Sequence, residues 1–335
     1  MSGPPRVSIL LPAWNAAATL QACLASITRQ SEPAWQCIIV DDGSDDGTER
    51  IAARFARDDG RFRVLSTPHR GIIEALNTGL RLCEASLVAR MDADDVMCRE
   101  RLRAQADFMD ARPETVGVGT HVRIFPRARM KPRLRDYEAW LNSLSCGESV
   151  RRDAFVECPV AHPTLMMRRE MAALGYRDAG WPEDYDLVLR ALQLEMRLEI
   201  LPRRLHLWRD REAALSRTDP RYAQDRFTAC KAQFLADGFL REASSYVLWG
   251  YGGTGRALRR ALAEHGRHPS HIVEVKRSRL RQVIHGAPVI APGDLLRVRA
   301  HRVIVSVARA GPRAEIRAAM AAMGFSEGRD FVCAA

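Results

Sequence analysis

The chain has 335 residues and a formal net charge of +10, and 47% of its residues are hydrophobic. This length is enough for about two domains, and such an apolar fraction is typical of a globular protein. No apolar run approaches the roughly 18 residues that span a bilayer, and the N-terminus lacks the apolar segment of a secretory signal. The sequence therefore predicts a cytoplasmic protein, with attachment to the inner face of the membrane left open.

The positive charge is concentrated at the C-terminal end of the chain. Residues 244–335 contain 15 Lys and Arg against 6 Asp and Glu, a surplus of +9. Such a surplus can attract a phosphorylated ligand, an anionic membrane face or an acidic partner, or it can serve only solubility. We expect no nucleic-acid partner, because no aromatic-studded basic groove accompanies it. The eight cysteines form no C-x-x-C pair and are expected to be reduced thiols.

The first part of the chain alternates between short apolar runs and stretches with helical periodicity. Strands are predicted at residues 7–11, 36–40, 62–65 and 87–91, and helices at residues 17–30 and 72–83. This alternation predicts an α/β fold with a mostly parallel sheet. Ligands of such sheets bind at the carboxyl ends of the strands.

Polar residues follow three of these predicted strands, so we expect them to converge on one crevice. In chain order they are Trp14 with Asn15, Asp41 with Asp42, and the acidic group Asp92, Asp94 and Asp95. Each group also has a purely structural interpretation. A surface aromatic with a helix cap would explain the first, and a turn rich in Asp, Gly and Ser would explain the second.

The acidic group places three carboxylates within four residues, where they repel one another. Mg²⁺ and Mn²⁺ prefer oxygen ligands, and Mg²⁺ typically takes one or two carboxylates and completes its shell with phosphate and water. The sequence therefore predicts a divalent cation bound to a diphosphate. The alternative is an acidic cap on the helix predicted at residues 99–109.

A second acidic cluster lies at the start of a helix predicted to continue to residue 194. Pro182 fits the first helical turn, which places Glu183, Asp184 and Asp186 near the positive end of the helix dipole. A carboxylate there stays ionised and can accept a proton. The alternative is a capping cluster that only stabilises the helix.

Together the motifs resemble those of the family 2 glycosyltransferases, which are inverting enzymes with the GT-A fold. The resemblance covers about residues 7–237 and rests on the segments Val7–Asn15, Val40–Thr48, Ala75–Leu80, Ala89–Asp95, His162–Thr164 and Trp181–Leu187. It implies transfer of a sugar from a nucleotide diphosphate donor, UDP by default, to a hydroxyl of a glycan, lipid-linked or other acceptor. It also implies Mg or Mn as the cofactor and a role in cell-surface polysaccharide or glycoconjugate synthesis.

The resemblance implies roles for individual residues. Nucleotide contacts fall on Pro12, Trp14, Asn15, Asp41, Asp42 and Asp92. The metal falls on Asp94, with Asp95 as a substitute, and the catalytic base is Asp184. The acceptor or sugar pocket falls on Trp181, Glu183 and Asp186. The chain departs from the family at Arg211, which lies near a position where many relatives have a histidine. Arginine cannot ligate a metal, so this departure affects how the metal would be coordinated.

The C-terminal part of the sequence has the pattern of a second α/β domain. A strand predicted at residues 246–249 leads into a G-x-G-x-x-G loop and a helix at residues 256–265, and the next predicted strand carries Glu274. The loop glycines are Gly250, Gly252 and Gly255. We therefore expect a GT-A domain at residues 1–240 and a small Rossmann-like domain at residues 244–335. Such a loop can bind a ligand or serve only to pack the helix on the strand.

Two other functions are compatible with parts of the sequence. The chain could be a catalytically inactive regulatory protein that binds nucleotide sugars, although the retained Asp42, Asp94 and Asp184 argue against this. A dehydrogenase built on the C-terminal domain is the other. That domain has no visible substrate half and no Tyr-Lys or His-Asp set.

Overall fold

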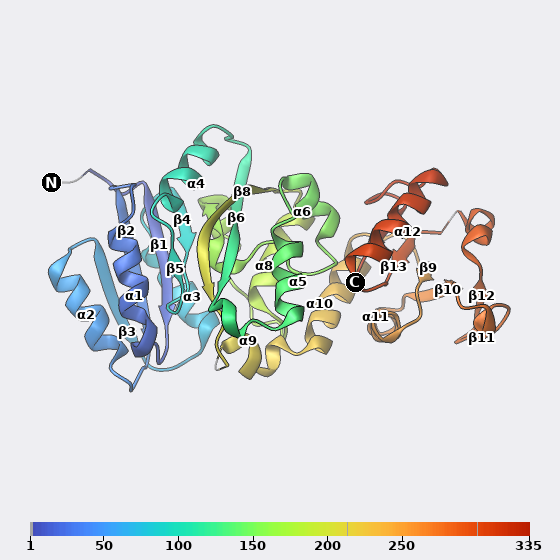
Figure 1. The fold of residues 1–335 in the computed structure, drawn as a ribbon, viewed down its shortest axis with the longest axis horizontal. Coiled ribbons are helices and arrows are strands. Elements are labelled where there is room, and N and C mark those ends of the chain that lie inside the picture. Colours follow the sequence, from blue (N-terminus) through green and yellow to red (C-terminus); the bar gives the residue numbers. More distant parts are fainter. Residues whose placement is uncertain (1–2, 213, 300) are drawn as a thin grey trace. The chain divides into compact units, whose positions relative to one another are not determined.

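A computed structural model describes residues 3–212, 214–299 and 301–335 (Figure 1). The chain forms two compact units. The first comprises Met1–Val150, Val160–Ala179 and Asp186–Ala214, and the second comprises Arg151–Pro159, Gly180–Tyr185 and Leu215–Ala335. We propose that the two domains comprise residues 1–240 and residues 244–335. Among the described helices, none combines the length and the apolar character needed to cross a membrane.

The first unit is built on an eight-stranded sheet with the strand order β3-β2-β1-β4-β7-β6-β8-β5. Its strands are β1 (Val7–Ala13), β2 (Trp35–Asp42), β3 (Phe62–Thr67), β4 (Leu87–Arg90), β5 (Val96–Met97), β6 (Thr115–Phe125), β7 (Met166–Arg168) and β8 (Arg197–Arg209). The first four strands of this order lie parallel to one another, as the sequence predicts. Strand β7 then pairs antiparallel with both β4 and β6, so the second half of the sheet is mixed.

Helices connect the parallel strands. The helices up to the second acidic cluster are α1 (Ala17–Thr28), α2 (Thr48–Asp58), α3 (Ile72–Leu82), α4 (Arg101–Asp110), α5 (Pro132–Leu141), α6 (Gly147–Asp153), α7 (Arg169–Ala172) and α8 (Glu183–Gln193). Helix α3 approaches β1 and β2 closely at Gly79, where an added Cβ would collide with the Leu10 side chain and lie 3.2 Å from Val40. This close packing holds the parallel half of the sheet against its helices.

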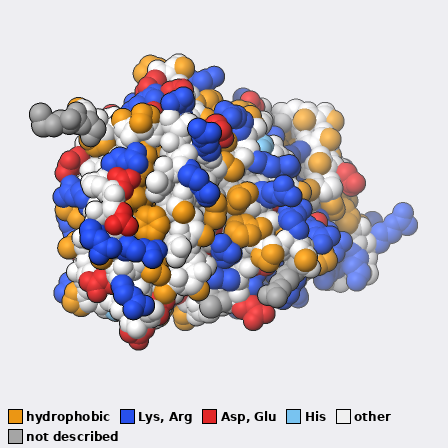
Figure 2. All heavy atoms as spheres, turned by 60° about the vertical axis from the view of Figure 1, so that its left-hand side comes forward, with side chains coloured by type: hydrophobic (Ala, Val, Ile, Leu, Met, Phe, Trp, Pro, Cys, Tyr) orange, Lys and Arg blue, Asp and Glu red, His pale blue; other side chains and the backbone are white. Residues whose placement is uncertain are grey.

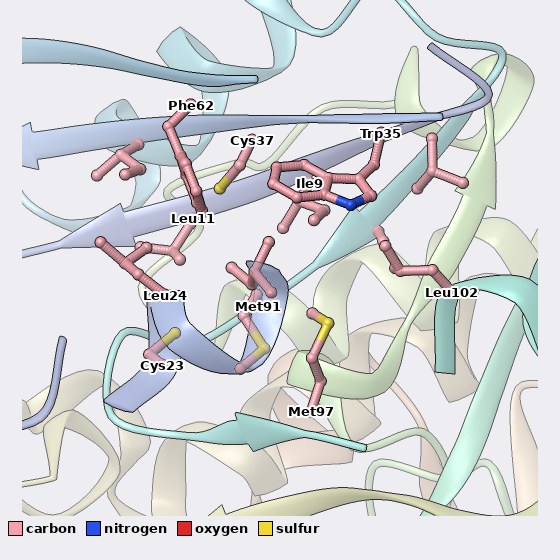
Figure 3. Packing of buried hydrophobic residues seen from close by; sticks show 14 of the residues in the cluster. Ile9, Leu11, Cys23, Leu24, Trp35, Cys37, Phe62, Met91, Met97 and Leu102 are labelled. Atoms are coloured by element: carbon pink, nitrogen blue, oxygen red, sulfur yellow. The ribbon is translucent and has the colours of Figure 1, made fainter. Parts of the chain in front are cut away.

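Strands β1 and β2 are buried over their whole length, which explains why they read as continuous apolar runs. Their side chains pack with α1 and with the segment after β4 in one core cluster (Figure 3). Trp35 contributes most volume and contacts Phe62 edge to face at 5.1 Å. Met91, the residue before Asp92, is fully buried in the same cluster. The acidic segment therefore begins on a tightly packed base.

Strand β8 is the longest element that the sequence did not predict. It has 13 residues and lies parallel to β6, yet it contains Pro202, which cannot donate to a β-ladder. The pairing passes from Thr120 with Leu201 to His121 with Arg204, so Pro202 and Arg203 lie in a bulge. The proline and the charged residues around it hide the strand in the sequence.

The second unit contains a six-stranded sheet with the order β11-β12-β10-β9-β13-β14. Its strands are β9 (Ser245–Trp249), β10 (His268–Val273), β11 (Val283–Ile284), β12 (Ala287–Ile290), β13 (Val303–Val305) and β14 (Phe331–Cys333). Its helices include α9 (Leu215–Thr218), α10 (Gln224–Asp237), α11 (Gly253–Glu264) and α12 (Ala310–Ala322). Strand β9 pairs in parallel with β10 and β13, and α11 connects β9 to β10. A second, smaller α/β sheet is thus present, as the sequence predicts.

Charged side chains are spread over the face of the molecule shown in Figure 2. Figure 2 shows more Lys and Arg than Asp and Glu on the face in view, in keeping with the net charge of +10. Acidic side chains are interspersed among the basic ones on that face.

Candidate active site

Three adjacent parallel strands bring the residues predicted for the nucleotide and the metal to one edge of the first sheet. Strand β1 lies between β2 and β4, and its last residue, Ala13, pairs with Asp41. The pairing of β1 with β4 ends at Leu10, so Pro12 lies on a part of β1 that is paired only with β2. The residues that follow these three strands therefore leave the sheet at the same edge, as the parallel order predicts.

The loop after β2 holds the start of α1. Asn15 has a positive φ of 46°, its amide N–H donates to Ser44 Oγ at 2.9 Å, and its side-chain oxygen accepts from the Asp45 N–H at 3.1 Å. The next two backbone N–H groups donate to Thr48 Oγ1 and to Asp46 Oδ2. These bonds satisfy N–H groups that a helix start otherwise leaves free. Asn15 is thus fixed as part of the helix entry.

Asp41 and Asp42 are both nearly fully buried, and each accepts hydrogen bonds from its own surroundings. Asp41 Oδ1 accepts from the Ser44 hydroxyl at 2.5 Å. The two oxygens of Asp42 accept from the backbone N–H groups of Arg70 and Gly71, both at 2.8 Å. The carboxylate of Asp42 is therefore held in one orientation at the end of β2.

Trp14 forms an exposed aromatic surface beside this carboxylate. It is 49% exposed and stacks on the His69 ring, with the ring centroids 4.4 Å apart and an angle of 19° between the planes. His69 Nδ1 in turn lies 2.9 Å from Asp42 Oδ2. The three side chains form a connected series in which Trp14 has one ring face against His69. A flat ring supported in this way is suited to stack on a nucleobase.

The acidic turn after β4 brings its three carboxylates together. One ligand oxygen each from Asp92, Asp94 and Asp95 lies within 4.8 Å of the others. Helix α1 fixes the backbone of this turn, because Thr19 Oγ1 donates to the Ala93 carbonyl at 3.1 Å and Cys23 Sγ donates to the Asp92 carbonyl at 3.3 Å. Helix α1 therefore holds the backbone of the segment that carries the three carboxylates.

Asp95 is engaged inside the protein. It is fully buried, Oδ2 lies 2.7 Å from His206 Nε2, and Oδ1 accepts from the Arg209 N–H at 2.6 Å. The other ring nitrogen of His206 lies 3.1 Å from Arg101 Nη1, which can only donate. Burial lowers the pKa of His206 well below its usual value, in agreement with a neutral ring that donates from Nε2. Asp95 thus anchors β8 to the acidic turn.

Asp92 and Asp94 are less buried than Asp95, and each has an arginine partner. Arg90 Nη1 lies 2.7 Å from Asp92 Oδ1, and Arg211 Nε lies 2.6 Å from Asp94 Oδ2. Burial, followed by the negative charges of Asp92 and Asp95, raises the pKa of Asp94 to about 6. Negative charge is thus concentrated at this point despite the two arginines. The atoms that could bind a metal here are all carboxylate oxygens. This is a set that fits Mg²⁺ or Mn²⁺, with Asp92 and Asp94 as the residues that would hold the ion.

Comparison with known proteins identifies the family. The profile of glycosyl transferase family 2 matches residues 8–174. The amylovoran biosynthesis glycosyltransferase AmsE of Erwinia amylovora is 30% identical over 200 residues, which are 58% of this chain and 73% of AmsE. The chain belongs to glycosyl transferase family 2. The putative glycosyltransferase EpsE of Bacillus subtilis is 28% identical to this family 2 glycosyltransferase over 247 residues, covering 69% of the chain and 84% of EpsE.

Solved structures agree on the fold of this family 2 glycosyltransferase. Residues 1–349 of S. aureus TarS, crystallised with UDP-GlcNAc, align with a TM-score of 0.55 and 18% identity, over 78% of this chain and 71% of that one. At this identity the likeness concerns the fold alone. It confirms the GT-A fold that the sequence predicts.

The second acidic cluster of this glycosyltransferase lies at the start of α8, and its members differ in burial. Glu183 is 2% exposed, and both of its oxygens accept from the Tyr222 hydroxyl, at 2.8 and 2.7 Å. Asp186 is fully buried between Arg177 and Arg190, with contacts of 2.7 and 2.6 Å. Asp184 is part-exposed, and its Oδ1 accepts from the Tyr185 N–H at 2.7 Å. Of these three acids, Asp184 is thus the most accessible to a substrate.

Trp181, the fourth residue expected near the acceptor, precedes α8 and is part-buried. We keep it as a proposed pocket residue. For Glu183 and Asp186 the protein partners described above favour a role in holding α8 in place over direct contact with an acceptor.

The ion pairs of Asp186 give a stability prediction. Asp186→Asn is expected to lower the free energy of unfolding by about 3 kcal/mol, because it leaves Arg190 largely buried without its counter-charge. Urea denaturation followed by circular dichroism measures this change. Asp58→Asn, at an exposed site at the end of α2, serves as the control. Wild-type stability combined with weakened acceptor binding would instead support a pocket role for Asp186.

The sequence did not indicate several residues that complete the site. His69 supports Trp14, and His206 together with Arg101 supports Asp95. No local pattern could reveal these pairs, because His206 lies 111 positions from Asp95 and 105 from Arg101. Arg90 carried a usable signal: it stands two residues before Asp92, where a basic residue in an apolar strand needs an acidic partner.

Proposed function

We propose that the chain transfers a sugar from a nucleotide diphosphate donor to an acceptor hydroxyl with inversion at the anomeric carbon and with the help of Mg²⁺ or Mn²⁺. The clustering of Asp92 and Asp94 at the edge that also carries Trp14 and Asp42 is the observation on which this proposal rests. A UDP-sugar is the proposed donor, since the TarS fragment of the same fold was crystallised with UDP-GlcNAc. A growing cell-surface polysaccharide is the proposed acceptor, since AmsE acts in amylovoran biosynthesis.

Donor binding follows from the residues at the strand ends. The nucleobase would stack on the free face of Trp14, whose other face contacts His69. The Asp42 carboxylate, held by two backbone N–H groups, would accept a hydrogen bond from the base or ribose. Asp92 and Asp94 would hold the cation beside the diphosphate, and Arg211 would add a guanidinium there.

The chemical step is a displacement at the anomeric carbon. The acceptor oxygen forms the new bond, the bond to the diphosphate breaks, and its electron pair leaves with the diphosphate. A bound divalent cation would act as a Lewis acid that stabilises the negative charge on this leaving group. Asp184, at the positive end of α8, would take the proton of the acceptor hydroxyl. Inversion follows, because attack comes from the side opposite the leaving group.

A donor screen tests the proposed function. We expect one nucleotide sugar in a panel to raise the thermal midpoint in the presence of Mn²⁺ more than in EDTA. Mass analysis should then show release of the nucleoside diphosphate when the protein is incubated with that donor and with candidate acceptors. A protein that binds the donor but never hydrolyses or transfers the sugar would instead be a regulatory binding protein.

Removal of the aromatic surface gives a further prediction. Trp14→Ala is expected to weaken binding of the donor nucleotide by about 1–3 kcal/mol, which is the usual contribution of one base stacked on an aromatic ring. Because Trp14 is half exposed, the thermal midpoint without ligand should change little. Calorimetric titration with UDP measures the affinity. Equal affinities for the variant and the wild type would show that the base lies elsewhere.

A further inference from the structure

The glycine loop of the second unit contains two glycines that internal packing requires. Gly250, directly after β9, has a φ of 96°, and an added Cβ would lie 2.6 Å from Val307 and 3.0 Å from the Ser306 carbonyl oxygen. At Gly255, in the first turn of α11, an added Cβ would collide with the Gly250 carbonyl oxygen. The close approach of α11 to the end of β9 therefore explains these two positions.

The other two glycines of the loop have no such explanation. Gly252 is the N-cap residue of α11 and has a φ of −80°, a value that any residue adopts, and Gly253 is the first residue of the helix. An added Cβ at either position would meet no atom within 4 Å. The fold therefore does not need glycine there. The two positions therefore face open space at the start of a 12-residue helix, whose first N–H groups are suited to bind an anion.

A buried hydroxyl beside this loop lacks a hydrogen-bond partner within the described part of the chain. Ser306 follows β13, the neighbour of β9, and its backbone N–H donates to the Trp249 carbonyl at 2.8 Å. It is 3% exposed, and its Oγ makes no hydrogen bond. Its Cβ lies 3.7 Å from the Cβ position at Gly255, so the hydroxyl is placed against the first turn of α11. A buried hydroxyl without a partner is costly, and a ligand oxygen would satisfy it.

An arginine and a glutamate lie beside the loop. Arg279 Nη1 donates to the Tyr251 carbonyl at 3.1 Å, which places a guanidinium at the loop. The same nitrogen lies 3.0 Å from Glu274 Oε2, and Glu274 Oε1 accepts from the Val275 N–H. The acid expected to contact a ribose is therefore already bonded to a neighbouring cation. Recognition here would depend mainly on negative groups of the ligand.

We propose that the loop formed by Gly250–Gly255, together with Ser306 and Arg279, is a second binding site that takes the diphosphate of a nucleotide. The helix N–H groups and the guanidinium would hold the phosphate oxygens, and Ser306 would donate one hydrogen bond. The diphosphate can come from a nucleotide sugar or from a dinucleotide. The site needs no divalent cation, because its donors are N–H and O–H groups. The proposal does not depend on the sugar transfer proposed for the first unit.

Titration of the full chain in EDTA with UDP, NAD⁺ and inorganic pyrophosphate tests this site. We expect at least one probe to bind, and Gly253→Asp to weaken its binding at least tenfold. Aspartate in the first turn favours the helix, so loss of binding cannot be attributed to unfolding of α11. UDP binding that Gly253→Asp weakens would identify a nucleotide sugar as the natural source, and NAD⁺ binding that it weakens would identify a dinucleotide. Binding of pyrophosphate alone would show that the phosphates are sufficient.

Two further variants complete the experiment. Gly60→Asp adds the same charge at an exposed glycine of the first unit, where an added Cβ also meets nothing within 4 Å, and it should bind every probe as the wild type does. Ser306→Ala should keep or raise the thermal midpoint without ligand and should weaken probe binding several-fold. The proposal is wrong if no probe binds in EDTA, or if Gly253→Asp binds the probes as tightly as Gly60→Asp.

Discussion

Asp184→Asn is expected to lower the rate of sugar transfer by about 10²–10⁴-fold, the usual contribution of a general base. Asparagine has nearly the same shape but cannot accept the proton of the acceptor hydroxyl. No donor contact is assigned to Asp184. The affinity for the donor nucleotide should therefore stay within about twofold of the wild type, whereas a tenfold change would correspond to a loss of about 1.36 kcal/mol of binding free energy. Product formation at saturating donor, together with calorimetric titration of UDP, separates the two effects.

Asp225→Asn is the matched control for this variant. Asp225 also lies in the first turn of a helix of the second unit, α10, but its side chain is 76% exposed. Its substitution should change neither turnover nor nucleotide affinity. If Asp184→Asn retained wild-type turnover, Asp184 could not be the base, and another group would have to accept the proton.

Asp94→Asn is expected to abolish the effect of divalent cations on donor binding. The substitution removes one of the two carboxylates proposed to hold the ion and leaves a neutral amide in its place, which attracts a divalent cation much less strongly. The affinity of the variant for the donor nucleotide in Mn²⁺ should therefore fall to that of the wild type in EDTA. Turnover should fall on the order of 10³-fold, because Lewis-acid stabilisation contributes several kcal/mol.

Titration with Mn²⁺ gives a readout that does not depend on turnover. The electron paramagnetic resonance signal of free Mn²⁺ should decrease on addition of the wild type with UDP and should persist with Asp94→Asn. Asp58→Asn, at an exposed site in the same unit, should behave as the wild type does. Equal nucleotide affinity of the wild type with Mn²⁺ and with EDTA would contradict the metal site, and Arg211 would then be the main cation at Asp94.

The sequence predicted the parallel half of the first sheet because the signal for each of its strands lies in a few neighbouring residues. Apolar runs that end in polar residues mark buried parallel strands, and β1, β2 and β4 are neighbours in the sheet. Trp14, Asp42 and Asp92 therefore leave the sheet together, as expected. The small C-terminal sheet was also predictable, because its glycine loop sits between a strand and a helix.

Other features depend on contacts between distant parts of the chain. A bulge at Pro202 conceals β8, and this strand supplies His206 to Asp95. The sequence treats Asp94 and Asp95 as equivalent, whereas the fold buries Asp95 completely and leaves Asp94 partly accessible. Glu183, Asp184 and Asp186 likewise look alike in the sequence, whereas the fold buries Glu183 and Asp186 against partners and leaves Asp184 part-exposed. Burial and pairing are tertiary properties that composition and spacing do not contain.

Helix α1 has a consequence for attempts to change donor preference. Its start is bonded to the loop after β2, and the hydroxyl of Thr19 in its first turn and the thiol of Cys23 one turn later hold the backbone of the acidic turn. The helix thus connects the loop after β2, which is proposed to bind the base, to the acidic turn, which is proposed to bind the metal and the phosphates. A substitution that moves the loop after β2 is therefore expected to move the acidic turn as well, unless α1 is redesigned together with it.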